Sequence, residues 1–216
     1  MDTVIALELM AGLRMTLYLS VVSGILSLIF GTLLGILRVS PWLPLRALAE
    51  GYIEFFRNIP LLIVMFFVFA GLPFAGIRLD PVGVDYSNSA IVALTAYTSA
   101  YVGEVVRAGI ESISQGQVEA GRSLGMSYVQ LLAYVLLPQT FRMIVPPLGN
   151  LFIALTKNTS IASAIAVQEL MYKTQLIESR TFNGDIYFVT GLIYLVLTIP
   201  LAALVNAVER KLVIQN

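Results

Sequence analysis

Neither cysteine nor histidine occurs among the 216 residues of this sequence, and charge of either sign is scarce. Without these two residue types the chain has no disulfide, thiol nucleophile or histidine-ligated metal, and few groups that serve as general bases. Thirteen basic and thirteen acidic residues cancel, so no charged tail indicates nucleic acid as a partner. These absences argue against an enzyme, and we expect neither a metal nor a cofactor in this chain.

Hydrophobic residues are what the sequence has in abundance. They make up 58% of the chain and charged residues only 12%, proportions outside the range of soluble globular domains. The sequence therefore predicts an integral membrane protein. Acidic residues precede Arg14 and no small-residue cleavage site follows, so we expect no signal peptide.

Long apolar runs predict an all-α fold with five transmembrane helices, because a helix needs about 20 apolar residues to cross the hydrocarbon core. The polar segments 76–88 and 168–185 are then outer connections. The expected spans cover approximately residues 17–37, 61–74, 90–106, 141–157 and 186–205.

Two features accompany the first span. Gly24, Gly31 and Gly35 recur at spacings of seven and four, which favours close packing of another helix over the alternative of lipid-facing glycines. Residues 39–57 follow, with Arg46, Glu50, Glu54 and Arg57 on one face and apolar side chains on the other. This pattern predicts an amphipathic helix at the cytoplasmic interface.

Hydroxyl groups lie at the middle of the third span. Tyr97, Thr98 and Tyr101 stand where polar side chains tend to face the bundle interior or a water-filled cavity. They are candidate residues of a transport path. Glu104, nearer the inner end, is expected to pair with Arg107 three residues later.

The fourth span contains two prolines and ends on a lysine. Pro146 and Pro147 leave backbone groups unpaired, which is tolerated at membrane depth only where protein or a wet cavity satisfies them. A lysine in such a run is a functional-site hypothesis by default. The candidate binding residues here are Asn150, Lys157, Asn158, Thr159 and Ser160.

A broken helix is expected directly after this lysine. Thr159 or Ser160 is suited to cap a new short helix over 161–172. Helices that are broken in this way often hold a substrate carboxylate at an exposed N-terminus.

A polar island over residues 114–138 separates the third and fourth spans. Ser114 with Gln117, and later Ser127 with Gln130, have the spacing of capping boxes, so two short helices are expected, the second ending at Pro138. Gly125 is suited to the left-handed turn between the two helices. Local patterns alone are also compatible with an ordinary cytoplasmic loop.

The middle of this island has the composition of a contact surface. Ala120 and Gly121 are adjacent small residues that would let another protein approach closely, and Glu119 and Arg122 offer charge on neighbouring turns. The spacing of Glu119, Ala120 and Gly121, then Gly125, and then Val135, Leu137 and Pro138 resembles the EAA loop of ABC importer permeases. Gly121 stands where that family usually has a second alanine.

This resemblance implies a type I ABC importer permease with one permease domain over residues 1–216. In that family the EAA loop is the coupling helix, which sits in a cleft of the ATP-binding subunit and transmits its closure. The implied partners are a second permease subunit, identical or paralogous, two ATP-binding subunits and an extracytoplasmic amino-acid-binding protein. ATP and magnesium then belong to the partner, since this chain has no G-x-x-x-x-G-K-[ST] loop.

Two further stretches resemble polar amino-acid permeases. One is Glu54-x-x-Arg57-x-x-Pro60, and the other is PLGNLFIALTKNTSIASA over 147–164, with Asn158 where aspartate is common. Loss of a buried negative charge lowers repulsion toward a second substrate carboxylate, so we hypothesise import of glutamate or aspartate. Import of glutamine or of a basic amino acid such as arginine or histidine is the alternative, with Asn158 then a neutral capping residue, and an ATP-independent channel is a distant one.

The distribution of basic residues predicts the orientation in the cytoplasmic membrane. With the EAA loop inside, eight basic residues lie inside and four outside, which agrees with the positive-inside rule. The N-terminus is then outside and the C-terminus in the cytoplasm. The inner residues are Arg38, Arg46, Arg57, Arg107, Arg122, Arg142, Arg210 and Lys211, and the outer ones are Arg14, Arg78, Lys173 and Arg180.

Overall fold

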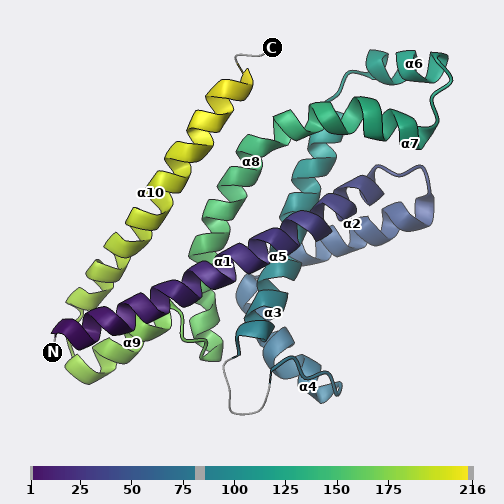
Figure 1. Ribbon diagram of the computed structural model, residues 1–216. Coiled ribbons are helices and arrows are strands. Elements are labelled where there is room, and N and C mark those ends of the chain that lie inside the picture. The colour runs from purple at the N-terminus through teal and green to yellow at the C-terminus, as the bar shows by residue number, and fades with distance from the viewer. Residues whose placement is uncertain (1, 81–85, 214–216) are drawn as a thin grey trace.

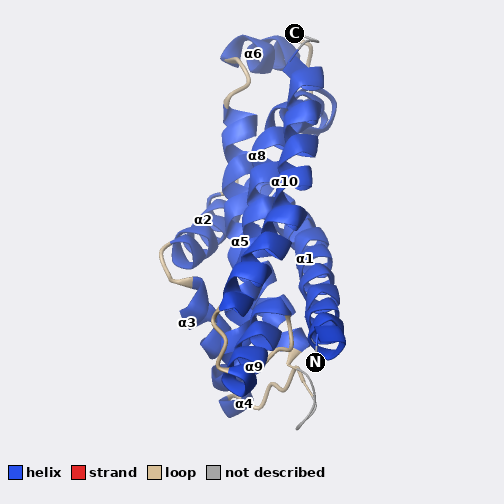
Figure 2. Ribbon diagram, turned by 90° about the vertical axis from the view of Figure 1, so that its left-hand side faces the viewer, coloured by secondary structure: helices blue, strands red, loops and turns tan. Residues whose placement is uncertain are grey.

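The computed structural model describes residues 2–80 and 86–213, which form helices and short connections without strands (Figures 1 and 2). The all-α prediction is confirmed, and residues 81–85 of the expected outer segment lie outside the described part. The elements are α1 (Asp2–Arg38), α2 (Leu43–Arg57), α3 (Leu61–Phe66), η1 (Phe67–Gly71), α4 (Leu72–Phe74), α5 (Ser87–Glu111), α6 (Gln115–Ser123), α7 (Tyr128–Leu131), η2 (Leu132–Leu136), α8 (Leu137–Asn158), η3 (Thr159–Ile165), α9 (Leu170–Thr181) and α10 (Asp185–Val213).

Within these ranges, four stretches are long and apolar enough to cross a membrane, and a bent pair of helices brings the total to as many as five. The pair is α2 followed by the segment Leu61–Phe74, which turn from one to the other by 106°. Both views place α6 and the end of α10 at one end of the molecule, and the start of α1, α4 and α9 at the other (Figures 1 and 2).

Helix α5 is the central element and packs closely against α1. A Cβ atom added to Gly31 would lie 2.5 Å from Val102 Cβ, and one added to Gly35 would lie 2.6 Å from Val106 Cβ. Only glycine fits at such separations, so the predicted close packing of these two residues is confirmed. Gly24 faces α8 instead, where an added Cβ would meet side chains of Leu155 and Phe152 at an ordinary 3.6 Å.

The expected helix end at Pro138 is wrong. The helix that begins at Tyr128 passes through the π-helical turn Leu132–Leu136 and continues as α8 to Asn158. Proline lacks the amide hydrogen that an α-helix needs at that position. The π-turn just before it shifts the backbone hydrogen bonds by one residue, so the helix continues past the proline. Pro146 and Pro147 likewise lie inside α8.

The expected short helix over 161–172 is also wrong. Thr159 and Ser160 donate their hydroxyl hydrogens to the carbonyl oxygens of Thr156 and Lys157, and the chain continues as the 3-10 helix Thr159–Ile165. Helix α9 begins later, at Leu170, and Glu169 is its cap. A carboxylate that accepts two backbone N–H groups outcompetes a hydroxyl that is already bonded to its own helix.

Glu169 is a fully buried carboxyl group between the spans Tyr128–Ile165 and Asp185–Lys211. It accepts hydrogen bonds from the backbone N–H groups of Met171 at 2.9 Å and Tyr172 at 2.7 Å. The hydroxyls of Tyr194 and Thr16 donate to it from α10 and α1 at 3.3 and 3.5 Å. Burial dominates over these bonds and raises the pKa of the Glu169 carboxyl to about 7.

The packing of α1 on α5 gives a first prediction. We expect Gly31→Ala to destabilise the protein by about 1–3 kcal/mol, because its Cβ would overlap Val102 and the backbone oxygen of Ser99. Gly24→Ala is the matched control and should leave the melting temperature in detergent nearly unchanged. Equal melting temperatures for the two variants would contradict the close contact.

A second prediction follows from the raised pKa of Glu169. The folded protein holds the Glu169 proton up to a pH of about 7, whereas an ordinary glutamate loses it near its usual value of 4.5. The contribution of this proton to the free energy of unfolding is therefore fully present below about pH 4.5 and is lost as the pH rises through 7. It amounts to a total on the order of 3 kcal/mol.

The melting temperature in detergent should accordingly fall more between pH 5 and pH 8 for the wild type than for Glu169→Gln. Glu178→Gln, on the same helix α9, is the control and should keep the wild-type slope. A slope that Glu169→Gln leaves unchanged would show that another group titrates.

Candidate functional site

A cavity of about 180 Å³ lies between α5 and the last turns of α8. From α5 it is lined by Tyr97, Thr98 and Tyr101, which share a face because residues one turn apart are neighbours on a helix. From α8 it is lined at helical spacing by Leu151, Ala154, Leu155 and Asn158. Four of the eight sequence-predicted binding residues are thus brought together, namely Tyr97, Thr98, Tyr101 and Asn158.

The polar groups of this cavity are neutral. The hydroxyls of Tyr97 and Tyr101 lie 3.0 Å apart and share a hydrogen bond, and the two rings pack with centroids 5.0 Å apart. Thr98 is buried and Asn158 is half-buried. The cavity therefore offers hydroxyl and amide groups between apolar walls, an arrangement that suits a small polar molecule.

The other four predicted residues lie outside the cavity. Asn150 and Lys157 are exposed, Thr159 is fully buried, and Ser160 bonds to the backbone of its own helix. Consecutive residues on a helix point about 100° apart. Of the four consecutive residues 157–160, only Asn158 faces this space for that reason.

The predicted coupling segment forms a helical hairpin at one end of the molecule (Figure 1). Ser127 and Gln130 make the full capping box at the start of α7, and Gly125 has a φ of 77°, so both predictions are confirmed. Ser114 precedes α6 without a side-chain hydrogen bond, so the predicted box there does not form.

Gly121 has a different role in this hairpin from the one that the sequence indicates. Glu119, Ala120 and Arg122 are exposed, but Gly121 is buried, and an added Cβ would lie 2.6 Å from Leu131 Cδ1. The small residue that is open to another protein is therefore Ala120. Gly121 instead lets α6 approach α7.

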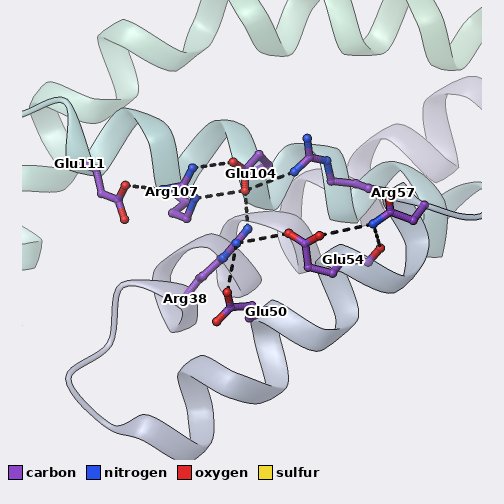
Figure 3. Close-up of polar contacts among 8 residues, drawn as sticks. Arg38, Glu50, Glu54, Arg57, Glu104, Arg107 and Glu111 are labelled. Carbon is purple, nitrogen blue, oxygen red and sulfur yellow. Dashed lines mark hydrogen bonds and ion pairs between the residues drawn. The ribbon is translucent and has the colours of Figure 1, made fainter.

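A cluster of charged side chains joins α1, α2 and α5 near the cavity (Figure 3). The Glu104 carboxylate accepts hydrogen bonds from Arg107 and from Arg38, each at 2.5 Å. The predicted pair Glu104–Arg107 is thereby confirmed. Arg38 also lies 3.6 Å from Glu50 and 3.5 Å from Glu54, so the charged face of α2 turns toward α1.

Arg57, at the end of α2, connects this cluster to the cavity. Its Nη1 lies 3.7 Å from Glu104 Oε2, and its guanidinium carbon lies 5.9 Å from the centroid of the Tyr101 ring. This is within the range of a cation–π contact. One face of Tyr101 is therefore covered by a cation, while the side chain also lines the cavity.

Over residues 27–214 the sequence matches the family of binding-protein-dependent transport system inner membrane components. The chain belongs to this family. It is 44% identical over 204 residues to the probable glutamine ABC transporter permease protein GlnM of Bacillus subtilis, with 94% of this chain and 92% of that protein covered. The glutamate transport system permease protein GluC of Corynebacterium efficiens is 35% identical over 219 residues, with 97% and 96% covered.

The fold of this permease also matches a solved amino acid ABC transporter with histidines. The TM-score is 0.86 at 32% sequence identity, with 95% of this chain and 94% of that chain covered. The type I permease fold and the amino-acid importer class predicted from the sequence are thereby confirmed. The chain is a transporter component of the membrane.

The connection between the charged cluster and the cavity of this permease is not predicted by any pattern in the sequence. Arg38 and Glu104 are 66 residues apart, and Arg57 and Tyr101 are 44 apart in the numbering, so no local pattern pairs them. The usable signal was the recurrence of charge at helical spacing on α2, which indicates one polar face but not its partner.

Proposed function

We propose that this permease imports a neutral polar amino acid, with glutamine as the first candidate. The observation that carries the proposal is the cavity whose polar lining consists of Tyr97, Thr98, Tyr101 and Asn158. A charged substrate side chain would lose its hydration there without gaining an opposite charge, which is costly. The amide of glutamine instead both donates and accepts, as the Asn158 amide does. The similarity to GlnM supports this choice.

Glutamate or aspartate is the second candidate. Asn158 brings no negative charge to the cavity, and the similarity to GluC supports an acidic substrate. The exposed Lys157 lies next to Asn158, and a second permease subunit would change its surroundings. A basic substrate such as arginine or histidine has the least support, because no carboxylate lines the cavity among the described residues.

We further propose that the complex contains two permease subunits, two ATP-binding subunits and an extracytoplasmic binding protein. The surface for the ATP-binding subunit is the exposed side of α6 with Glu119, Ala120 and Arg122, followed by the turn at Gly125. With α6 in the cytoplasm, the end of α10 lies on the same side and the start of α1 outside. Closure of the ATP-binding subunits then opens the cavity to one side at a time, as in alternating access.

Substrate-stimulated ATP hydrolysis by the reconstituted complex tests the substrate assignment. We expect glutamine to stimulate the wild type more than glutamate or arginine does. Asn158→Asp should lower the response to glutamate at least about tenfold, through like-charge repulsion, and raise the response to arginine. Lys157→Ala, outside the cavity, is the control for glutamine. A wild type that responds best to arginine would reject the proposal, and transport that persists without ATP would indicate a channel.

The coupling surface gives a separate prediction. Ala120→Arg should strongly reduce co-purification of the ATP-binding subunit while the melting temperature of the permease stays the same, because Ala120 is exposed. Gly121→Val should do the reverse and destabilise the permease by about 1–3 kcal/mol, through overlap with Leu131. Ser123→Ala, also exposed on α6, is the control for both. Normal co-purification with Ala120→Arg would place the coupling surface elsewhere.

A further inference from the structure

Arg57 stands at a junction of three structural elements. It is the last residue of α2, directly before the 106° bend to α3, and its guanidinium group lies against the ring of Tyr101 on α5. Tyr101 in turn lines the cavity and shares a hydrogen bond with Tyr97. The structure thus places this cation one aromatic ring away from the space that the proposed function assigns to the substrate.

The contact between Arg57 and Glu104 is the weakest of the three that arginines make with this carboxylate. Arg38 and Arg107 each bond to it at 2.5 Å, whereas Arg57 lies 3.7 Å away, beyond hydrogen-bond distance. The side chain of Arg57 is 37% exposed, against 13% for Arg38 and 24% for Arg107. Glu104 therefore stays neutralised by two arginines when Arg57 moves. The N–H groups of Arg57 can then donate hydrogen bonds to another group.

Every free amino acid carries an α-carboxylate, yet the lining of the cavity contains no cation among the described residues. Burial of a carboxylate without a partner is costly, and a guanidinium group is the side chain best suited to hold one, through two parallel hydrogen bonds. The guanidinium carbon of Arg57 lies 5.9 Å from the centroid of the Tyr101 ring, and Tyr101 lines the cavity.

We propose that Arg57 binds the α-carboxylate of the transported amino acid, with Glu104 as its partner while the cavity is empty. This inference rests on the proposed function, in which the cavity holds an amino acid. Arg57 then selects for amino acids as a class, whereas Asn158 at the other wall selects among their side chains. Arg57 is the last residue of α2, directly before the bend. Its transfer from Glu104 to the substrate therefore also changes the contacts of α2 when the cavity is occupied.

Binding of two ligands to the purified permease–ATPase complex in detergent, without the binding protein, tests this inference. One ligand is glutamine and the other is 4-aminobutanamide, which is glutamine without its α-carboxylate, and saturation-transfer difference NMR measures their weak affinities. For the wild type we expect glutamine to bind at least about tenfold more tightly. In Arg57→Gln glutamine should bind as weakly as 4-aminobutanamide does, while the affinity for 4-aminobutanamide changes less than about twofold. Arg57→Lys should restore part of the difference.

Arg46→Gln is the matched control, because Arg46 is an exposed arginine on the same helix, and it should leave both affinities unchanged. A loss of affinity in Arg57→Gln that is equal for both ligands would show a merely structural role and overturn the inference. So would a difference that survives in Arg57→Gln but disappears in Lys157→Gln. A wild-type complex that binds neither glutamine nor glutamate would instead reject the proposed substrate cavity itself.

Discussion

The ion pairs of the Glu104 carboxylate are the contacts on which the packing of helices around the cavity depends. This carboxylate binds arginines from α1 and from its own helix α5 and lies beside a third at the end of α2. Charges in or near a membrane persist only when they are paired. Glu104 is a shared partner of Arg38 and Arg107 and so joins α1 to α5, while Arg38 joins them to α2 through Glu50 and Glu54. The glycine contacts of α1 with α5 lie next to these ion pairs, since Gly35 packs on Val106, two residues beyond Glu104.

The orientation of α2 follows from this cluster. Glu50 and Glu54 approach Arg38, and Tyr52 donates its hydroxyl hydrogen to the carbonyl oxygen of Ala96 on α5 at 3.0 Å. Leu48 and Phe55 remain exposed, as apolar side chains at a bilayer surface do. The charges of this helix therefore attach it to the bundle, while these apolar side chains stay exposed on its surface. Its last residue, Arg57, thereby lies beside Tyr101, which lines the cavity.

The sequence predicts features set by neighbouring residues better than those set by contacts across the chain. The glycine turn at Gly125 and the capping box at Ser127 are encoded within a few residues, and the structure contains them. Four of the five expected spans correspond to single long apolar helices, and the span at 61–74 is present only as the second part of a bent pair. The continuation of the helix through Pro138 is not predicted, because it depends on a π-turn that accommodates the missing amide hydrogen. No pattern in the sequence indicates such a turn. Glu169 was missed as a cap because its burial depends on Thr16 and Tyr194, each far away in the chain.

The continuity of the helix through Pro138 bears on the proposed transport mechanism. Because the helix does not end there, one nearly unbroken element runs from Tyr128, beside the proposed coupling surface, to Asn158 in the wall of the cavity. At 1.5 Å per residue this element measures roughly 45 Å along its axis, which bends between α7 and the end of α8 (Figure 1). No loop interrupts the chain between α7 and the cavity, although the element contains a π-turn and the internal prolines Pro146 and Pro147. The π-turn at Leu132–Leu136 lies at the end of this element that is nearer to the hairpin. The proposed coupling surface on α6 and the cavity wall that faces Tyr97 and Tyr101 are thus connected through consecutive helical turns.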